Sequence, residues 1–327
     1  MKRFILFLIF LTLGSAYAQQ SLNPDISVVG EFNISKDTAS GQYVPGIGEL
    51  ELGITAPIDP YSTATVILSH SASGVEIEEG FMKISSLPFD LQAKLGRMRV
   101  DFNHLNKLHS HELPFIEYPK YLQDFFGNDG LIKNGAEISY LLPLGFYSEI
   151  KAQWLSGDSD NSFAASQGIA GLKWKNFFEV GDAGGLEIGF SQLQGINNSG
   201  LTPTADFKNQ ISGMNIRYKH ILGPQSYLVF NNEWLWSRSD YNGFVSTHGN
   251  FNYVGYQVDQ YWQGGVGIND SQTPDGTTIY HDTFVALHYK WTEFQSYRLK
   301  YYRDGQNNDG ILFTLNFILG PHPVHEF

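Results

Sequence analysis

Histidine and carboxylate side chains, the ligand types that suit zinc and similar ions, are concentrated in one segment of this sequence, residues 101–131. The members with ligand chemistry are His104, His109, His111, Glu112, Glu117 and Asp124. His109, His111 and Glu112 are adjacent enough to be the candidate metal ligands. They lack the HExxH spacing of a catalytic zinc site, so the expectation is transient zinc binding. The alternative is that these histidines are ordinary solvated residues on the surface.

The same segment is rich in residues that oppose disorder. It contains Pro114, Phe115, Tyr118, Pro119, Tyr121, Phe125 and Phe126. Long insertions between strands are usually functional or disordered, and the aromatic rings and prolines favour the first possibility. An ordered insertion needs a surface to pack against, so the segments on either side of it decide where it lies.

Those flanking segments alternate apolar and polar residues, the period of a strand with one apolar and one polar face. The fourth segment slips phase at Glu78 and Glu79, which predicts a β-bulge. Each segment has about the length of a tilted membrane-crossing strand, ~9–11 residues. The predicted strands are 25–35, 47–57, 61–70, 75–85, 90–100, 132–141, 146–156, 167–177, 185–195, 210–221, 226–237, 249–259, 261–269, 279–290, 294–303 and 309–319.

Short and long connections alternate along the chain, which is typical of outer-membrane barrels with tight periplasmic turns and longer external loops. A soluble sandwich has no reason to keep that parity. The sequence therefore predicts an all-β fold, a transmembrane antiparallel β-barrel of about 16 strands. Apolar faces should look outward and polar faces inward. Aromatic residues near the strand ends, such as Tyr61, Trp154 and Trp291, should form interfacial girdles.

Residues 1–18 read as a cleaved signal peptide: Lys2 and Arg3 precede an apolar core at 4–13 and a small-residue cleavage signal at 16–18. That core is shorter than the ~20 residues of a membrane-spanning helix. Residues 19–327 are then one barrel domain. Removing the signal changes the net charge from −12 to −14, which excludes a nucleic-acid partner. The chain has no cysteine, which excludes disulfides and thiolate metal sites.

Four stretches together resemble a family of exported, porin-like outer-membrane β-barrels of Gram-negative bacteria: NPDISVVGEF, HSHELPFIEYPKYLQDFFGNDGL, ISYLLPLGFYSEIKAQ and GPHPVHEF. Members are labelled outer-membrane receptor, sometimes zinc-regulated or TonB-dependent. The resemblance implies a barrel surrounded by outer-membrane lipid. The terminal Phe327 is similar to the aromatic residue that barrel-insertion machinery reads, although residues 320–327 follow the last predicted strand as a tail. A TonB-dependent transporter needs a plug and ~22 strands, so that label is not expected to describe the mechanism.

By the parity of the connections, 101–131 is the third external loop, and it resembles the porin loop that folds into the barrel and narrows it. We expect its six ionisable residues to line a pore constriction, with a lid over the barrel mouth as the alternative. The predicted inward carboxylates are Glu49, Glu51, Glu76, Glu137, Glu149 and Glu187. They outnumber inward bases such as Lys94 and Lys151, which favours cations or metal ions, or merely keeps the lumen wet.

The expected function is passive passage of small hydrophilic solutes or ions across the outer membrane, by a monomer or a homo-oligomer. No enzyme is expected, since the chain has no GxSxG elbow and no spacing that defines a Ser-His-acid set. Two alternatives stay open: a non-conducting structural or adhesive barrel, and a metal-responsive receptor.

Overall fold

The computed structural model describes residues 24–37, 41–71, 74–157, 161–165, 167–198, 206–240 and 245–321. The predicted signal peptide and residues 322–327 of the predicted tail lie outside these described residues. No helix within the described ranges is long and apolar enough to cross a membrane.

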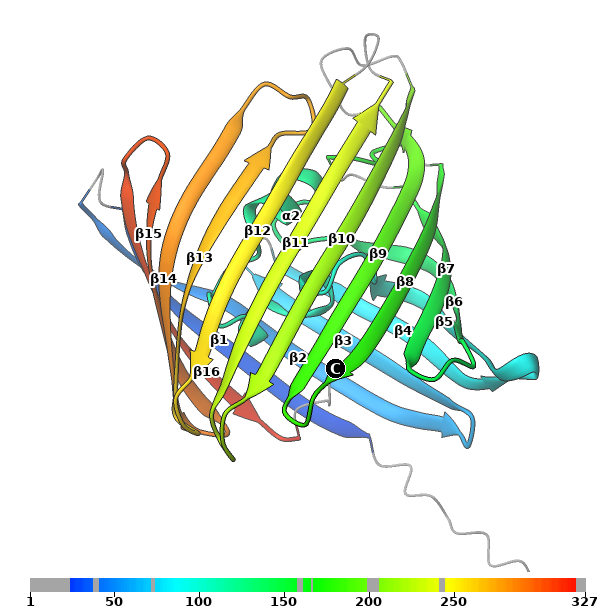
Figure 1. Ribbon diagram of the computed structural model, residues 1–327, viewed down its shortest axis with the longest axis horizontal. Coiled ribbons are helices and arrows are strands. Elements are labelled where there is room, and N and C mark those ends of the chain that lie inside the picture. Colours follow the sequence, from blue (N-terminus) through cyan, green and yellow to red (C-terminus); the bar gives the residue numbers. More distant parts are fainter. Residues whose placement is uncertain are drawn as a thin grey trace, which may run out of the picture.

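Sixteen strands, counted over the described residues, form a closed antiparallel barrel (Figure 1). Each strand pairs with its neighbours in sequence, and β1 pairs with β16 from Val28 opposite Leu319 to Asp37 opposite Gly310. This confirms the predicted fold class. The strands are β1 Asp25–Asp37, β2 Tyr43–Asp59, β3 Ser62–Ser71, β4 Gly74–Leu87, β5 Leu91–Arg99, β6 Ile132–Leu141, β7 Tyr147–Ser156, β8 Gly168–Val180, β9 Gly184–Asn197, β10 Phe207–Ile221, β11 Tyr227–Ser239, β12 Val245–Gln257, β13 Trp262–Gln272, β14 Ile279–Thr292, β15 Gln295–Asp304 and β16 Asp309–Leu319.

The pleat of each strand separates an outer from an inner face, as the alternation predicts. In β16, Thr314 and Asn316 are buried inside the barrel, whereas Phe317 on the other face is exposed. The outer surface carries exposed Leu, Ile, Val and aromatic side chains. Tyr61, Trp154 and Trp291, predicted for the girdles, are 63%, 64% and 59% exposed.

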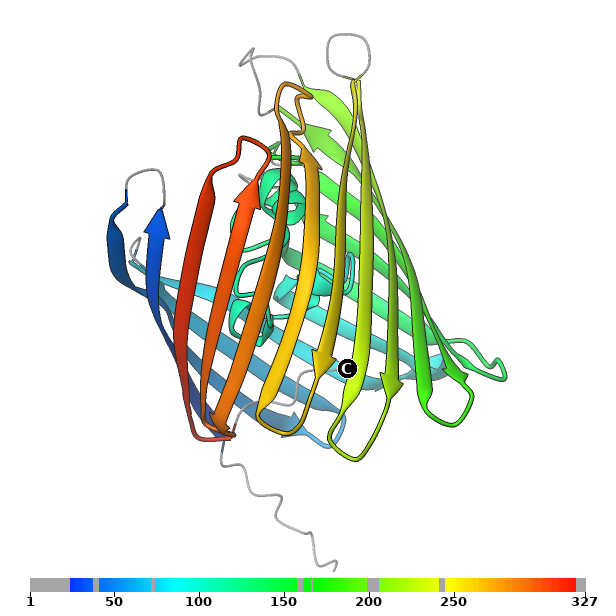
Figure 2. The ribbon, with the colours of Figure 1, turned by 60° about the vertical axis from the view of Figure 1, so that its left-hand side comes forward.

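The external ends of several strands extend into segments predicted as loops. β2 begins at Tyr43, β10 at Phe207 and β12 at Val245, because the hairpin ladders continue beyond the apolar part of the strands. Figure 2 shows the side of the barrel around β10–β12 standing higher than the side around β1 and β16. The alternation of short and long connections is also less strict than predicted, since β3 ends at Ser71 and β4 begins at Gly74.

A β-bulge interrupts β4 where the sequence slips phase. Ile67 of β3 pairs with Glu79 and Leu68 pairs with Ile77, so Glu78 is an extra residue on β4. A bulge places two residues against one on the partner strand. Glu78 and Glu79 are consequently both buried, each 5% exposed, on the inner side of the barrel.

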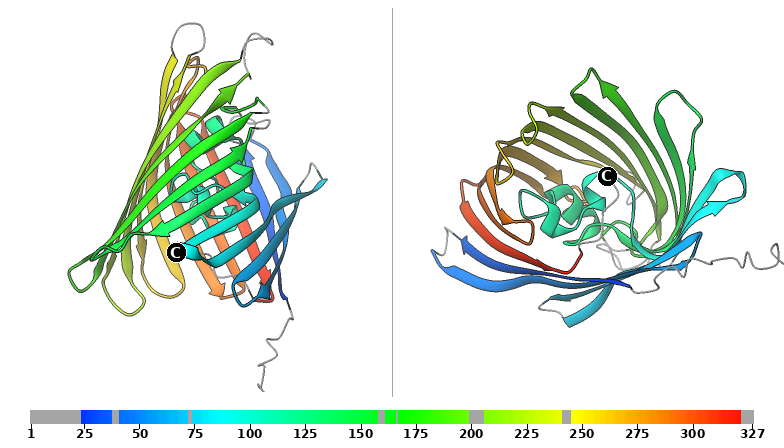
Figure 3. Two further views of the ribbon diagram at one scale, coloured as in Figure 1. Left: turned by 90° about the vertical axis from the view of Figure 1, so that its right-hand side faces the viewer. Right: turned by 90° about the horizontal axis from the view of Figure 1, so that it is seen from below.

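The segment between β5 and β6 lies inside the barrel (Figure 3), as predicted for the third external loop. It contains two short 3-10 helices, η2 Leu105–Lys107 and η3 Ser110–Glu112, and one α-helix, α2 Lys120–Phe126. A further 3-10 turn, η1 Pro88–Asp90, joins β4 to β5. Helix α2 follows Pro119. The residue after its last turn is Gly127, whose φ of 100° is a conformation that favours glycine.

The aromatic residues of this loop fill one side of the barrel. The ring of Phe115 lies 4.9 Å from that of Phe251 and 5.1 Å from that of Tyr253, between ring centroids. Leu193 and Ile211 belong to the same buried cluster. The prediction of uniformly polar inner faces is therefore wrong for β9 to β12 and for β14, because this wall receives the apolar side of the loop. Burying each large side chain contributes roughly 1.5–3 kcal/mol to loop docking.

Candidate functional site

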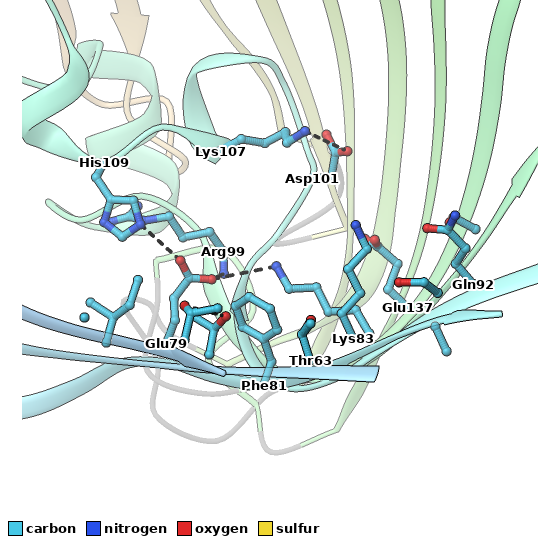
Figure 4. A pocket seen from close by; sticks show the side chains of 18 of the residues that line it. Thr63, Glu79, Phe81, Lys83, Gln92, Arg99, Asp101, Lys107, His109 and Glu137 are labelled. Atoms are coloured by element: carbon cyan, nitrogen blue, oxygen red, sulfur yellow. Dashed lines mark hydrogen bonds and ion pairs between the residues drawn. The ribbon is translucent and has the colours of Figure 1, made fainter. Parts of the chain in front are cut away.

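A polar cavity of about 540 Å³ remains between the loop and the inner faces of β1 to β7 (Figure 4). Lys107, Leu108 and His109 line it from the loop. The facing wall contributes residues of alternating charge, namely Lys83, Lys94, Glu137, Glu149 and Lys151. The loop thus packs its apolar side against one wall of the lumen and leaves a charged, solvent-accessible space along the other wall.

Two lysines of this cavity are more exposed than the carboxylates with which they pair. The side chains of Lys94 and Lys107 are 24% and 21% exposed, against 7% for Glu79 and 5% for Asp101. Asp101 lies 2.9 Å from the ammonium nitrogen of Lys151 and 3.8 Å from that of Lys107. Burial alone would raise the pKa of Asp101, but these two ammonium groups outweigh it and hold the pKa well below its usual range. Most of the carboxylates that line the cavity are thus paired with lysine ammonium groups.

Beside the cavity, four carboxylates and two imidazoles meet; we call them the Glu/His cluster. It consists of Glu49 and Glu51 from β2, Glu78 and Glu79 from β4, and His109 and His111 from η3 and its N-terminal flank. Strand alternation directs Glu49 and Glu51 inward together, and the bulge does the same for the two residues of β4. The two imidazole rings stack with centroids 5.5 Å apart.

His109 is the centre of this cluster and is 1% exposed. Its Nδ1 lies 3.4 Å from Oε1 of Glu51 and 3.3 Å from Oε1 of Glu78, and its Nε2 lies 3.1 Å from Oε1 of Glu79. Burial and the neighbouring Arg99 lower the pKa of His109, but the surrounding carboxylates outweigh both and raise it well above its ordinary value. In the absence of another cation, the imidazolium is the ion pair partner of these carboxylates.

The other predicted constriction residues bind the loop to itself or to the wall. His104 Nδ1 lies 3.4 Å from Glu187 Oε1, and burial lowers the pKa of His104. Glu112 accepts a hydrogen bond from the His109 backbone N–H at 2.7 Å, so its carboxylate caps η3. Glu117 pairs with Lys300 of β15 at 3.0 Å, beside a smaller cavity of about 190 Å³.

Asp124 pairs with Lys120 within α2 at 2.6 Å. Among the six predicted residues, His109 alone borders the 540 Å³ cavity, whereas Glu117 borders the smaller one.

Strand residues around the barrel fasten the loop in place. Arg298 of β15 donates to the backbone carbonyls of Ser110 and Leu113 at 2.8 and 2.7 Å, and also binds Glu31. On the opposite side, the Lys173 ammonium donates to the carbonyl of Phe102 at 2.6 Å. These contacts place the loop within the lumen instead of over the barrel mouth.

Glu233 of β11 provides a further anchor. It accepts hydrogen bonds from the Leu105 N–H at 2.8 Å and from the Tyr121 hydroxyl. Sequence reasoning did not select Arg298, Lys173 or Glu233, because a single charged residue within an alternating strand carries no signal of what it will meet.

No protein-family model matches the chain. An uncharacterized protein of Aquifex aeolicus (strain VF5) is 24% identical over 388 aligned positions, covering 96% of this chain and 82% of that protein.

Solved structures with the same fold include the loop L8 deletion mutant of OmpT, an outer membrane protein of Vibrio cholerae, with a TM-score of 0.60, 14% identity and coverage of 91% of this chain and 99% of that one. An anion-selective porin from Comamonas acidovorans superimposes with a TM-score of 0.61 and 12% identity, covering 91% of this chain and 99% of that one. Salmonella typhi OmpF in complex with daunomycin gives a TM-score of 0.60 and 11% identity, covering 90% and 97%. This chain therefore has the fold of the outer-membrane porin barrels.

Proposed function

We propose that the protein is a passive channel of the bacterial outer membrane for small hydrophilic solutes, with no enzymatic activity. The observation that carries this proposal is the polar cavity of about 540 Å³ beside an inward-folded loop. A barrel built only as a scaffold or adhesin has no need of a charged cavity on one side of a lumen whose other side is filled by aromatic packing. Solved porins of the same fold support the proposal by analogy.

Conductance across a planar bilayer tests this proposal. The purified protein should give discrete current steps, and replacing 105–125 by a short Gly-Ser linker should enlarge them. The strands supply the ladder bonds, so the deletion variant should remain a folded barrel, which heat-modifiable migration in gels verifies. Absence of steps from a folded wild-type barrel would favour the non-conducting alternative. Unaltered step size after the deletion would show that the loop does not limit the passage.

We further propose a weak preference for anions, in place of the cation preference that the count of inward carboxylates predicts. The reason is that Lys94 and Lys107 are more exposed to the cavity than Glu79 and Asp101, the carboxylates with which they pair. The reversal potential in a salt gradient should therefore favour anions, and replacing both lysines by Gln should shift it toward cations. Lys208, exposed at the external end of β10, provides the matched control Lys208→Gln. A cation-selective wild type would contradict this proposal.

A homo-oligomer is also proposed, on the basis of polar residues on the outer wall. Asn232 and Asn252 are paired on the outer faces of β11 and β12, next to the pair Phe230 and Val254, and they hydrogen-bond to each other. Asn252 is partly exposed, whereas Asn232 is covered by its neighbours. Amide groups facing hydrocarbon are costly, whereas a subunit interface tolerates them. OmpT of Vibrio cholerae has been solved in a trimer form with this fold. A monomer mass for the protein in mild detergent would contradict the proposal.

A further inference from the structure

We propose that the Glu/His cluster is a divalent metal site, in which the carboxylate of Glu51 and the imidazoles of His109 and His111 bind Zn²⁺. This set differs from the one that sequence spacing predicts, because Glu112 caps η3 and the carboxylate ligand comes from a strand. The metal would join the loop to β2.

The donor atoms are already spaced as ligands of one small ion. Zinc bonds of ~2.0–2.1 Å to nitrogen and oxygen place neighbouring tetrahedral ligands about 3.3–3.4 Å apart. Nδ1 of His109 lies 3.4 Å from Oε1 of Glu51. Nδ1 of His111 lies 3.2 Å from the same Glu51 oxygen. Ligand atoms of Glu51, His109 and His111 all lie within 4.8 Å of one another.

The cluster also carries oxygen atoms in need of a partner. Glu78 is 5% exposed, and among the described residues its buried Oε2 has no hydrogen-bond partner. Burial of such an atom costs desolvation free energy that no hydrogen bond offsets. Glu49, Glu51 and Glu78 also bring carboxylate oxygens within 4.8 Å of one another, which a cation between them would stabilise.

The surroundings of His109 resemble those of metal-bound histidines. Metal ligands of this type usually donate their second ring N–H to a carboxylate, which fixes the ring. With Nδ1 facing the ion, Nε2 of His109 faces Glu79 at 3.1 Å, and Figure 4 shows this contact. Glu79 is in turn 3.8 Å from Lys94. The η3 turn, capped by Glu112, sets the direction of both histidines.

The balance of charge favours a cation as well. The four carboxylates of the cluster face Arg99, which pairs with Glu78, and the imidazolium of His109. Lys94 lies at the edge, against Glu79. Buried carboxylates in excess of their cationic partners destabilise the docked loop, so a divalent ion would strengthen docking.

Titration of the detergent-solubilised barrel with zinc chloride, followed by calorimetry, tests the proposal. Wild type should bind one equivalent, and Glu51→Gln and His111→Ala should each weaken that binding at least tenfold. Glu76→Gln is the matched control, since Glu76 lies on the same strand β4 but is exposed and outside the cluster. Heat-modifiable migration verifies that each variant is folded.

Cobalt provides a second readout that does not depend on affinity. Bound Co²⁺ should give the intense visible absorption of tetrahedral coordination in wild type and in Glu76→Gln, and should lose it in His111→Ala. The proposal would be overturned if wild type bound no zinc, or if Glu51→Gln and His111→Ala bound zinc as tightly as wild type. Because binding is measured in micelles, its failure is separate from any failure to conduct ions.

Discussion

Arg298 offers the sharpest test of how the loop is held. Its side chain is fully buried, and it donates to the carbonyls of Ser110 and Leu113, to the Thr314 hydroxyl at 3.0 Å, and to Glu31. Replacing Arg298 by Ala removes all of these bonds and leaves the Glu31 carboxylate buried without its guanidinium. Breaking a buried pair in this way costs roughly 3–5 kcal/mol.

That cost should appear mainly as release of the loop, because the ladder bonds of β15 are backbone bonds and survive the substitution. At 1.36 kcal/mol per tenfold, the equilibrium between docked and released loop shifts by a factor of about 10²–10⁴. We expect larger and noisier single-channel currents, together with faster proteolysis within 101–131. Adding Glu31→Gln to Arg298→Ala should restore part of the docking, since the unpaired charge is then gone.

The matched control is Arg303→Ala on the same strand. Arg303 pairs with Asp309 at 2.5 Å, but its side chain is 54% exposed, so solvent screens the pair and its loss should have little effect on stability. The reasoning is refuted if Arg298→Ala conducts like wild type and is digested no faster than Arg303→Ala.

Two further predictions concern the wall and the loop. Leu315→Arg on the outer face of β16 should lower the free energy of unfolding by roughly 2–4 kcal/mol near the midplane, measured by denaturant titration in lipid. Asn316→Arg should lower it as well, because Asn316 accepts a hydrogen bond from Arg298 at 3.2 Å inside the barrel. A variant at position 316 as stable as wild type would contradict the inward placement of Asn316. The lowered pKa of Asp101 stabilises docking at all pH values above the unfolded value of ~3.9 and is lost as pH falls below it. Current noise should therefore stay constant from about pH 7 to 5 and rise below about pH 4, and Asp101→Asn should remove that pH dependence.

The barrel could be predicted from the sequence because its determinants are local. Strand period, strand length and the phase slip at Glu78 are properties of short stretches, and the structure places strands at all of the predicted positions. The apolar inner wall could not be predicted in this way. Phe251 and Phe284 face inward because the loop covers them, and that partner lies more than a hundred residues away in the sequence.

The cluster was accessible to sequence reasoning only in part. His109 and His111 were selected for their type, and Glu49 and Glu51 were predicted to point inward, but nothing in the sequence joins the two sets. The choice of Glu112 as a ligand relied on proximity along the chain. In a 3-10 turn that carboxylate reaches back to the His109 N–H, so the neighbour in sequence is not the neighbour of the imidazole.

The bulge in β4 has a consequence for how such a site can arise during evolution. Without Glu78, Ile77 and Glu79 would continue the pairing with Leu68 and Ile67 in unbroken alternation, and every other side chain of β4 would keep its face. Gain or loss of a single codon at this point therefore adds or removes one buried carboxylate while the rest of the barrel stays in register.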